Sequence, residues 1–189
     1  MRSAAEQYFS AIVYAEEKHK GAFRKGTDIP YIEHPLETME IVAELTDNQD
    51  VICAAVLHDT IEDAHVTVEE LERRFGPRVA ALVAGESENK REGLPAEQTW
   101  KVRKQESIDR LHRSSRETKI IALGDKLSNM RAIHRDYDQL GDGLWERFNC
   151  KDKAEQGWYY RSMLAALDEL SETKAWKELK RHVKAVFGQ

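Results

Sequence analysis

The residues best suited to chemistry stand together at positions 58–63, with the sequence HDTIED, directly after the apolar run VICAAVL. Adjacent His58 and Asp59 can both reach a metal ion seated over a helix, because one position turns the side chain by only about 100°. Glu62, at i+4 from His58 and i+3 from Asp59, would lie within reach of a water molecule beside the metal. The pattern predicts a metal centre with a carboxylate for proton transfer.

This motif by itself leaves a structural interpretation open, since a His-Asp dipeptide occurs by chance in many chains. Acidic residues near a helix C-terminus oppose the helix dipole, so helix stability does not explain Asp59 and Glu62. A chemical role for these two acidic residues is therefore favoured somewhat over a purely structural one.

Two residues elsewhere are of the types that bind metals. Asp125 follows the apolar run KIIALG and shares a helix face with Asn129, four positions on. A buried carboxylate needs a partner, which would be a metal ion or one of the nearby cations Lys126 and Arg131. His34 stands between a loop and a proline, where a histidine often merely caps or packs. Both interpretations stay open for each residue.

The elements expected to position these residues are all helices. The 189 residues suffice for one compact domain, and no alternating strand pattern occurs. We predict an all-α fold of eight or nine helices in a single domain over residues 1–189. Its motif-bearing core spans about 15–135, and its C-terminal helices span 152–187.

Three local predictions bear on the site. The third helix is predicted from Gln49 to Asp63, with the His-Asp pair inside it. The charged segment 86–95, ESENKREGLP, is predicted to be a mobile loop. A first helix ends near His19, and its predicted inner face carries Tyr8, Phe9, Ile12 and Val13.

Composition excludes several classes of protein. The net charge of −5 argues against a general nucleic-acid binder but permits a small phosphorylated substrate. Cys53 and Cys150 match no zinc or disulfide spacing, and Cys53 is expected to be a buried thiol. No segment has the length of a membrane span or the form of a signal peptide, so we expect no membrane association and a cytoplasmic location.

The motifs together resemble the hydrolase domain of RelA/SpoT-type alarmone enzymes, especially the small stand-alone alarmone hydrolases of the HD superfamily. The resemblance runs from residue 15 to residue 131. Each matching piece is short, but their order and spacing are specific. The pieces are HKG at 19–21, RK at 24–25, PYIEHP at 30–35, HDTIED at 58–63, FG at 75–76 and GDKLSNMR at 124–131.

The resemblance implies packed helices around one divalent metal ion, usually manganese. A nitrogen and oxygen ligand set without sulfur also favours a hard metal at an open site over structural zinc. The metal ligands implied by the resemblance are His34, His58, Asp59 and Asp125.

The resemblance also implies a reaction, the removal of the 3′-pyrophosphate from guanosine tetra- or pentaphosphate to give GDP or GTP. The expected partner is therefore a small-molecule nucleotide, and nothing in the sequence indicates an oligomeric state. Glu62 and Asp63 are implied as the acid/base and water-orienting pair. The implied substrate contacts are Arg24, Lys25 and Asn129, the last beside the attacked phosphate.

Two other functions stay open: an HD phosphohydrolase acting on another nucleotide or a phosphodiester, and a non-catalytic helical binding module. Ala132 replaces the small polar residue that alarmone hydrolases usually have. Segments 99–104 and 155–160 resemble a broader group of bacterial HD phosphohydrolases. Within the latter, Trp158, Tyr159 and Tyr160 could stack on a base, although helix packing is the favoured interpretation.

Overall fold

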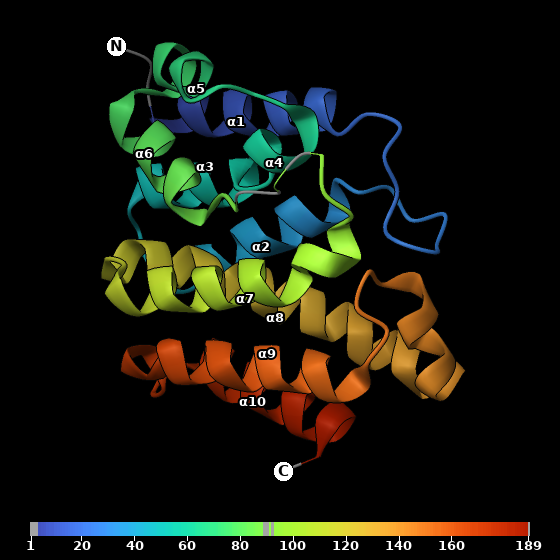
Figure 1. The fold of residues 1–189 in the computed structure, drawn as a ribbon. Helices are drawn as coiled ribbons and strands as arrows, with labels where there is room; N and C mark the ends of the chain where they lie inside the picture. Colours follow the sequence, from blue (N-terminus) through green and yellow to red (C-terminus); the bar gives the residue numbers. More distant parts are fainter. Residues whose placement is uncertain (1–3, 89–90, 92, 189) are drawn as a thin grey trace. The chain divides into compact units, whose positions relative to one another are not determined.

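The computed structural model describes residues 4–88, 91 and 93–188 (Figure 1). Within these residues the chain forms α-helices, two short 3₁₀ helices, turns and an isolated β-bridge between Phe23 and Pro30. The predicted all-α class is confirmed. The chain divides into two compact units, residues 1–87 with 115–125, and residues 88–114 with 126–189. The extent of the domain stays a prediction.

The first unit is built around α3, whose residues 51–57 are all buried. This helix packs against α1, α2 and α6. Cys53 lies within it, fully buried and outside any disulfide, as predicted. The helices of the unit are α1 (Ala4–Lys18), α2 (Glu33–Ala43), α3 (Gln49–Leu57), α4 (Thr60–Ala64), α5 (Val68–Phe75), α6 (Pro77–Glu86) and the first part of α8 (Arg116–Leu140).

The predicted single helix from Gln49 to Asp63 is wrong, because the helix is interrupted between α3 and α4. The Thr60 hydroxyl donates a 2.7 Å hydrogen bond to the Leu57 carbonyl, which a regular helix would pair with a backbone N–H. Asp59 has φ −91° and ψ −3°, typical of a turn. The His-Asp pair therefore lies at a helix junction and not inside a helix.

The predicted inner face of α1 is also partly wrong. Phe9 and Val13 are 67% and 55% exposed. The residues that α1 buries are Ala11, Tyr14 and Ala15. Small alanine side chains let α1 approach α3 closely, and the Tyr14 hydroxyl donates a 2.7 Å hydrogen bond to Glu70. The prediction counted large apolar side chains, whereas the buried face of this helix consists of two alanines and Tyr14.

The second unit contains α7 (Ala96–Arg113), the rest of α8, η1 (Gly141–Arg147), α9 (Lys153–Ala166), η2 (Asp168–Leu170) and α10 (Lys174–Phe187). In it, α9 packs against both α7 and α10. Tyr159 and Tyr160 are buried, which confirms the packing interpretation for these two rings. Trp158 is half-buried, with the Lys101 ammonium 3.3 Å from its ring centroid.

The segment predicted as a mobile loop lies partly outside the described residues, at 89, 90 and 92. Of its described residues, Glu86 still belongs to α6. The Glu88 carboxylate is largely buried and pairs with Arg103 and, at 2.8 Å, with Lys104. Across the described part of the chain, no helix combines the length and the apolar character that crossing a membrane requires.

Candidate metal centre

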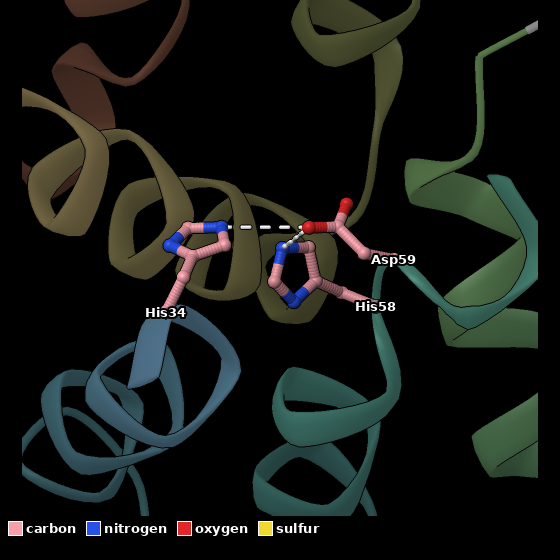
Figure 2. A group of neighbouring side chains, drawn as sticks. All are labelled: His34, His58 and Asp59. Atoms are coloured by element: carbon pink, nitrogen blue, oxygen red, sulfur yellow. Dashed lines mark ion pairs between the residues drawn. The ribbon is translucent and has the colours of Figure 1, made fainter. Parts of the chain in front are cut away.

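All four predicted ligands lie in the first unit, where Asp59 and Asp125 each lie close to both His34 and His58. His34 comes from the first turn of α2, His58 and Asp59 from the α3–α4 junction, and Asp125 from α8. Figure 2 shows the first three with their side chains turned toward one another. The fold therefore brings together residues that are as far as 91 positions apart in the sequence, at 34 and 125.

The two carboxylates are each close to both imidazoles. Asp59 Oδ2 lies 3.0 Å from His58 Nε2 and 3.5 Å from His34 Nε2. Asp125 Oδ1 lies 3.2 Å from His34 Nε2 and 3.8 Å from His58 Nε2. Both imidazoles are almost completely buried. Two nitrogens and two carboxylate oxygens thus lie close together among largely buried side chains.

The other nitrogen of His58 fixes how this ring is oriented. His58 Nδ1 lies 2.8 Å from the Ala55 carbonyl, which can only accept, so this nitrogen carries a proton. In neutral His58 the lone pair is then on Nε2, which is buried and makes no well-aligned hydrogen bond. Backbone carbonyls orient metal-binding histidines in this way. A lone pair facing a carboxylate at 3.0 Å calls for a cation beside them.

The electrostatics of the cluster also call for a positive charge. Burial lowers the pKa of His58, but the carboxylates of Asp59 and Asp125 outweigh it and raise that pKa to about 10. Burial raises the pKa of Asp59, but His58 and His34 hold it well below its usual range. The cluster holds a proton tightly where a divalent cation would neutralise two carboxylates. The residues present therefore fit a metal ion.

The predicted catalytic pair lies immediately beyond Asp59. Glu62 is half-buried and Asp63 exposed, and both belong to the short helix α4. The Asp63 backbone N–H donates a 2.9 Å hydrogen bond to the Asp59 carbonyl, so α4 starts directly at this predicted ligand. His58 and Glu62 do not belong to the same helix, so the i+4 relation that was predicted for them does not apply.

Of the predicted substrate contacts, Arg24 has a connection to the cluster through Tyr31. The Arg24 guanidinium lies 5.7 Å from the Tyr31 ring centroid, and the Tyr31 hydroxyl donates a 2.6 Å hydrogen bond to Asp59. Lys25 is exposed in the turn that follows Arg24. Asn129 is half-buried in the part of α8 that belongs to the second unit.

The sequence did not assign a role to Tyr31 or to His19. Burial and the Asp59 carboxylate raise the pKa of Tyr31, so its hydroxyl stays protonated and donates to Asp59. His19 is buried with its ring 4.9 Å from that of Tyr31, and burial lowers its pKa. Both residues lie in motifs of the resemblance, but a tyrosine in a loop has no periodic pattern that would reveal its contact with Asp59.

A helical fold that brings two histidines and two aspartates together is typical of helical domains that bind a metal ion. The HD domain family model matches residues 11–149, and the chain belongs to this family.

Several curated proteins are similar in sequence. A Danio rerio guanosine-3′,5′-bis(diphosphate) 3′-pyrophosphohydrolase, MESH1, is 36% identical over 137 residues, covering 70% of this chain and 72% of that protein. The human MESH1 is 35% identical over 138 residues, covering 71% and 74%. A protein of Aquifex aeolicus with the same enzyme name is 37% identical over 131 residues, covering 68% of this chain and 18% of that longer protein.

Two solved structures share the fold. The structure of a metazoan ortholog of SpoT that hydrolyses ppGpp matches with a TM-score of 0.79 and 23% identity, covering 100% of this chain and 99% of the other. A protein of Listeria monocytogenes EGD-e matches with a TM-score of 0.72 and 27% identity, covering 82% of this chain and 99% of the other. These matches agree with the all-helical prediction.

Proposed function

We propose that this protein is a metal-dependent phosphohydrolase that removes the 3′-pyrophosphate from guanosine 3′,5′-bis(diphosphate), consuming one water and giving GDP and pyrophosphate. The observation that carries the proposal is the convergence of His34, His58, Asp59 and Asp125 within 3.0 to 3.8 Å of one another across the four contacts given above. Relatives that are named for this reaction support the choice of substrate.

The proposed metal is a single divalent ion, with manganese first among the choices. Two imidazoles and two carboxylates form a mixed ligand set without sulfur, which suits such an ion and leaves room for water. When bound, the ion would supply Lewis-acid catalysis and a nucleophile from water near neutral pH.

The chain's own residues would divide the remaining work. The Glu62 carboxylate would accept a proton from the attacking water, and Asp63 beside it on α4 would orient that water. The Tyr31 hydroxyl holds one Asp59 oxygen in place and so keeps the ligand from rotating.

Substrate binding would depend on cations around the cluster. Arg24, placed over Tyr31, would offset the charge of the phosphates, with Lys25 next to it and Asn129 beside the phosphate under attack. A nucleotide is thus the proposed partner, and the cytoplasm stays the proposed location.

The test is turnover of guanosine 3′,5′-bis(diphosphate) by manganese-loaded protein, with GDP and pyrophosphate measured separately. We expect the two products in equal amounts, and none from the Asp125→Ala variant. A manganese-loaded protein that binds metal but leaves this nucleotide intact would disprove the substrate assignment.

Other phosphorylated substrates are tested in the same experiment, because Ala132 departs from the usual pattern of alarmone hydrolases. A panel of nucleoside phosphates and phosphodiesters, assayed at equal concentration, would identify an HD phosphohydrolase of other specificity. Cleavage of a panel member by wild-type protein and not by Asp125→Ala would support the metal centre and replace the substrate.

A further inference from the structure

Gly124 directly precedes Asp125 on α8. Among the glycines whose surroundings the structure describes, it has the shortest distances from a hypothetical Cβ to neighbouring atoms, and these atoms belong to α2. A Cβ added to Gly124 would lie 2.8 Å from Val42 Cγ2 and 3.0 Å from the Thr38 carbonyl oxygen. Both distances are shorter than normal van der Waals contacts, so a side chain here would require the Val42 side chain or the α2 backbone to shift.

The atoms that face Gly124 cannot easily give way. Thr38 and Val42 are fully buried, and the Thr38 contact includes a backbone oxygen. β-Branched side chains in a helix are held in few rotamers, so Val42 has little freedom to turn aside. The close packing of the interior means that relief must come from a shift of the helices by several tenths of an ångström.

The same face of α2 carries a metal ligand. His34, Thr38 and Val42 are spaced four residues apart, so they lie along one face of the helix. The spacing of α2 and α8 at Gly124 therefore also sets the separation of His34 and Asp125, whose Nε2 and Oδ1 atoms are 3.2 Å apart. A shift between the two helices would move one ligand away from the other.

We propose that Gly124 is a positioning residue for the metal centre, since only the absence of a side chain lets α8 bring Asp125 to His34. This inference rests on the proposed function, because it concerns the affinity for the proposed ion. It predicts that added bulk at position 124 weakens metal binding in protein that remains folded.

The experiment measures the dissociation constant for Mn²⁺ by calorimetry, and independently by the electron paramagnetic resonance signal of free Mn²⁺. We expect Gly124→Ala to bind Mn²⁺ about 10-fold or more weakly than wild type, as for the loss of a group that orients a ligand. The matched control is Gly85→Ala in α6, where the new Cβ would meet Thr118 at an ordinary 3.7 Å. This control should bind Mn²⁺ like wild type.

The Val42→Ala background separates packing from positioning. Removing Val42 Cγ2 should restore part of the affinity lost in Gly124→Ala, and the Thr38 carbonyl, still 3.0 Å from the new Cβ, should keep the rest from returning. If Gly124→Ala does not fold, Val42→Ala with and without Gly124→Ala gives the same comparison. Equal Mn²⁺ affinity in these two variants would then overturn the inference.

Two results would be easy to tell apart. A Gly124→Ala protein that is folded and binds Mn²⁺ as tightly as wild type overturns the positioning role and leaves the proposed function intact. A wild-type protein that binds Mn²⁺ no better than Asp125→Ala overturns the metal centre itself and the positioning role with it. Alanine favours a helix interior over glycine, so a higher melting temperature with unchanged affinity would also contradict the inference.

Discussion

Two pairs of histidines in this protein have nearly the same ring geometry and different surroundings. The rings of His34 and His58 in the first unit have centroids 5.0 Å apart at 77°, and those of His134 and His182 in the second unit 4.9 Å apart at 76°. The first pair is almost completely buried, whereas 28% of the His134 side chain is exposed. Ring arrangement alone therefore does not distinguish a metal centre.

The nitrogens and carboxylates do distinguish the pairs. His134 and His182 bond to each other through Nδ1 atoms 2.7 Å apart, so each already has a partner. The nearby Glu178 is held by two hydrogen bonds from Arg131, at 2.9 and 3.0 Å. The Nε2 atoms of the first pair lie 3.2 and 3.0 Å from carboxylate oxygens, closer than the 3.8 and 3.4 Å found in the second pair. In the first pair each carboxylate also lies within 3.8 Å of both imidazoles, as a shared cation site requires.

The largest effect is expected when a carboxylate is removed from the first pair, and removal of a carboxylate from the second pair serves as the control. Asp125→Ala should lose Mn²⁺ binding and turnover by more than about 10²-fold, since loss of a group that only orients a ligand already costs about 10- to 100-fold. Asp138→Ala, which removes the carboxylate 3.8 Å from His134 Nε2, should change neither. Calorimetry with Mn²⁺ and product assays on both variants make the comparison. Full activity in Asp125→Ala, or in metal-stripped wild type, would contradict the assignment.

Glu62 tests the division between holding the metal and handling the water. Glu62→Gln should keep Mn²⁺ affinity and lose kcat by about 10²-fold or more, because an amide cannot accept the proton. Glu72→Gln, at an exposed position of α5, is the matched control and should retain kcat. If Glu62→Gln loses the metal along with activity, Glu62 is a ligand and the assigned set must be enlarged.

The comparison of the two pairs extends to the arginines near them. Arg131, near the second pair, donates a hydrogen bond to Glu178, whereas Arg24 lies over the ring of Tyr31. Arg24→Ala should raise KM for guanosine 3′,5′-bis(diphosphate) with little change in Mn²⁺ affinity. Loss of one charge-assisted contact of about 1.5–3 kcal/mol corresponds to about 10- to 150-fold in kcat/KM. Arg73→Ala, an exposed cation on α5, should behave like wild type. An unchanged KM in Arg24→Ala would remove this residue from the substrate site.

The sequence singled out those candidate site residues that a local pattern marks. His58, Asp59 and Asp125 each end or border an apolar run, which is visible in a few residues. His34, which stands between a predicted loop and a proline, offered no such pattern, so its predicted role as a ligand came from the resemblance alone. The helical class was predictable for the same reason, because apolar periodicity and capping are local.

What the sequence did not predict depends on contacts between distant residues or on single side chains competing with the backbone. The Tyr31–Asp59 hydrogen bond spans 28 positions, and the clash that makes Gly124 necessary comes from α2. At the break after Leu57 the Thr60 hydroxyl bonds to a backbone carbonyl, and the buried face of α1 includes alanines that carry little weight in an apolar count.

The smallest effect is expected at the second histidine pair, where protonation should weaken folding and leave metal binding unchanged. Burial lowers the pKa of His182, as do the neighbouring His134 and Arg181, against the opposing effect of Glu178. Arg131 and Asp138 on α8 are the other charges nearby. Because the folded-state pKa lies below the ordinary value of about 6.5, the unfolded chain binds more protons in between, and stability falls as the pH is lowered through this window.

His182→Gln removes the titrating group and keeps an amide that can hydrogen bond to His134. Thermal unfolding at about pH 7.5 and pH 5.5 should show a melting temperature that falls more in wild type than in this variant, the difference isolating His182 from all other titrating groups. Solvent around the pair screens the charges, so the difference should be small, about 1–2 °C. An equal fall in both proteins would mean that the His134–His182 bond accepts a second proton without strain, and the contrast between the two pairs would then rest on their carboxylates alone.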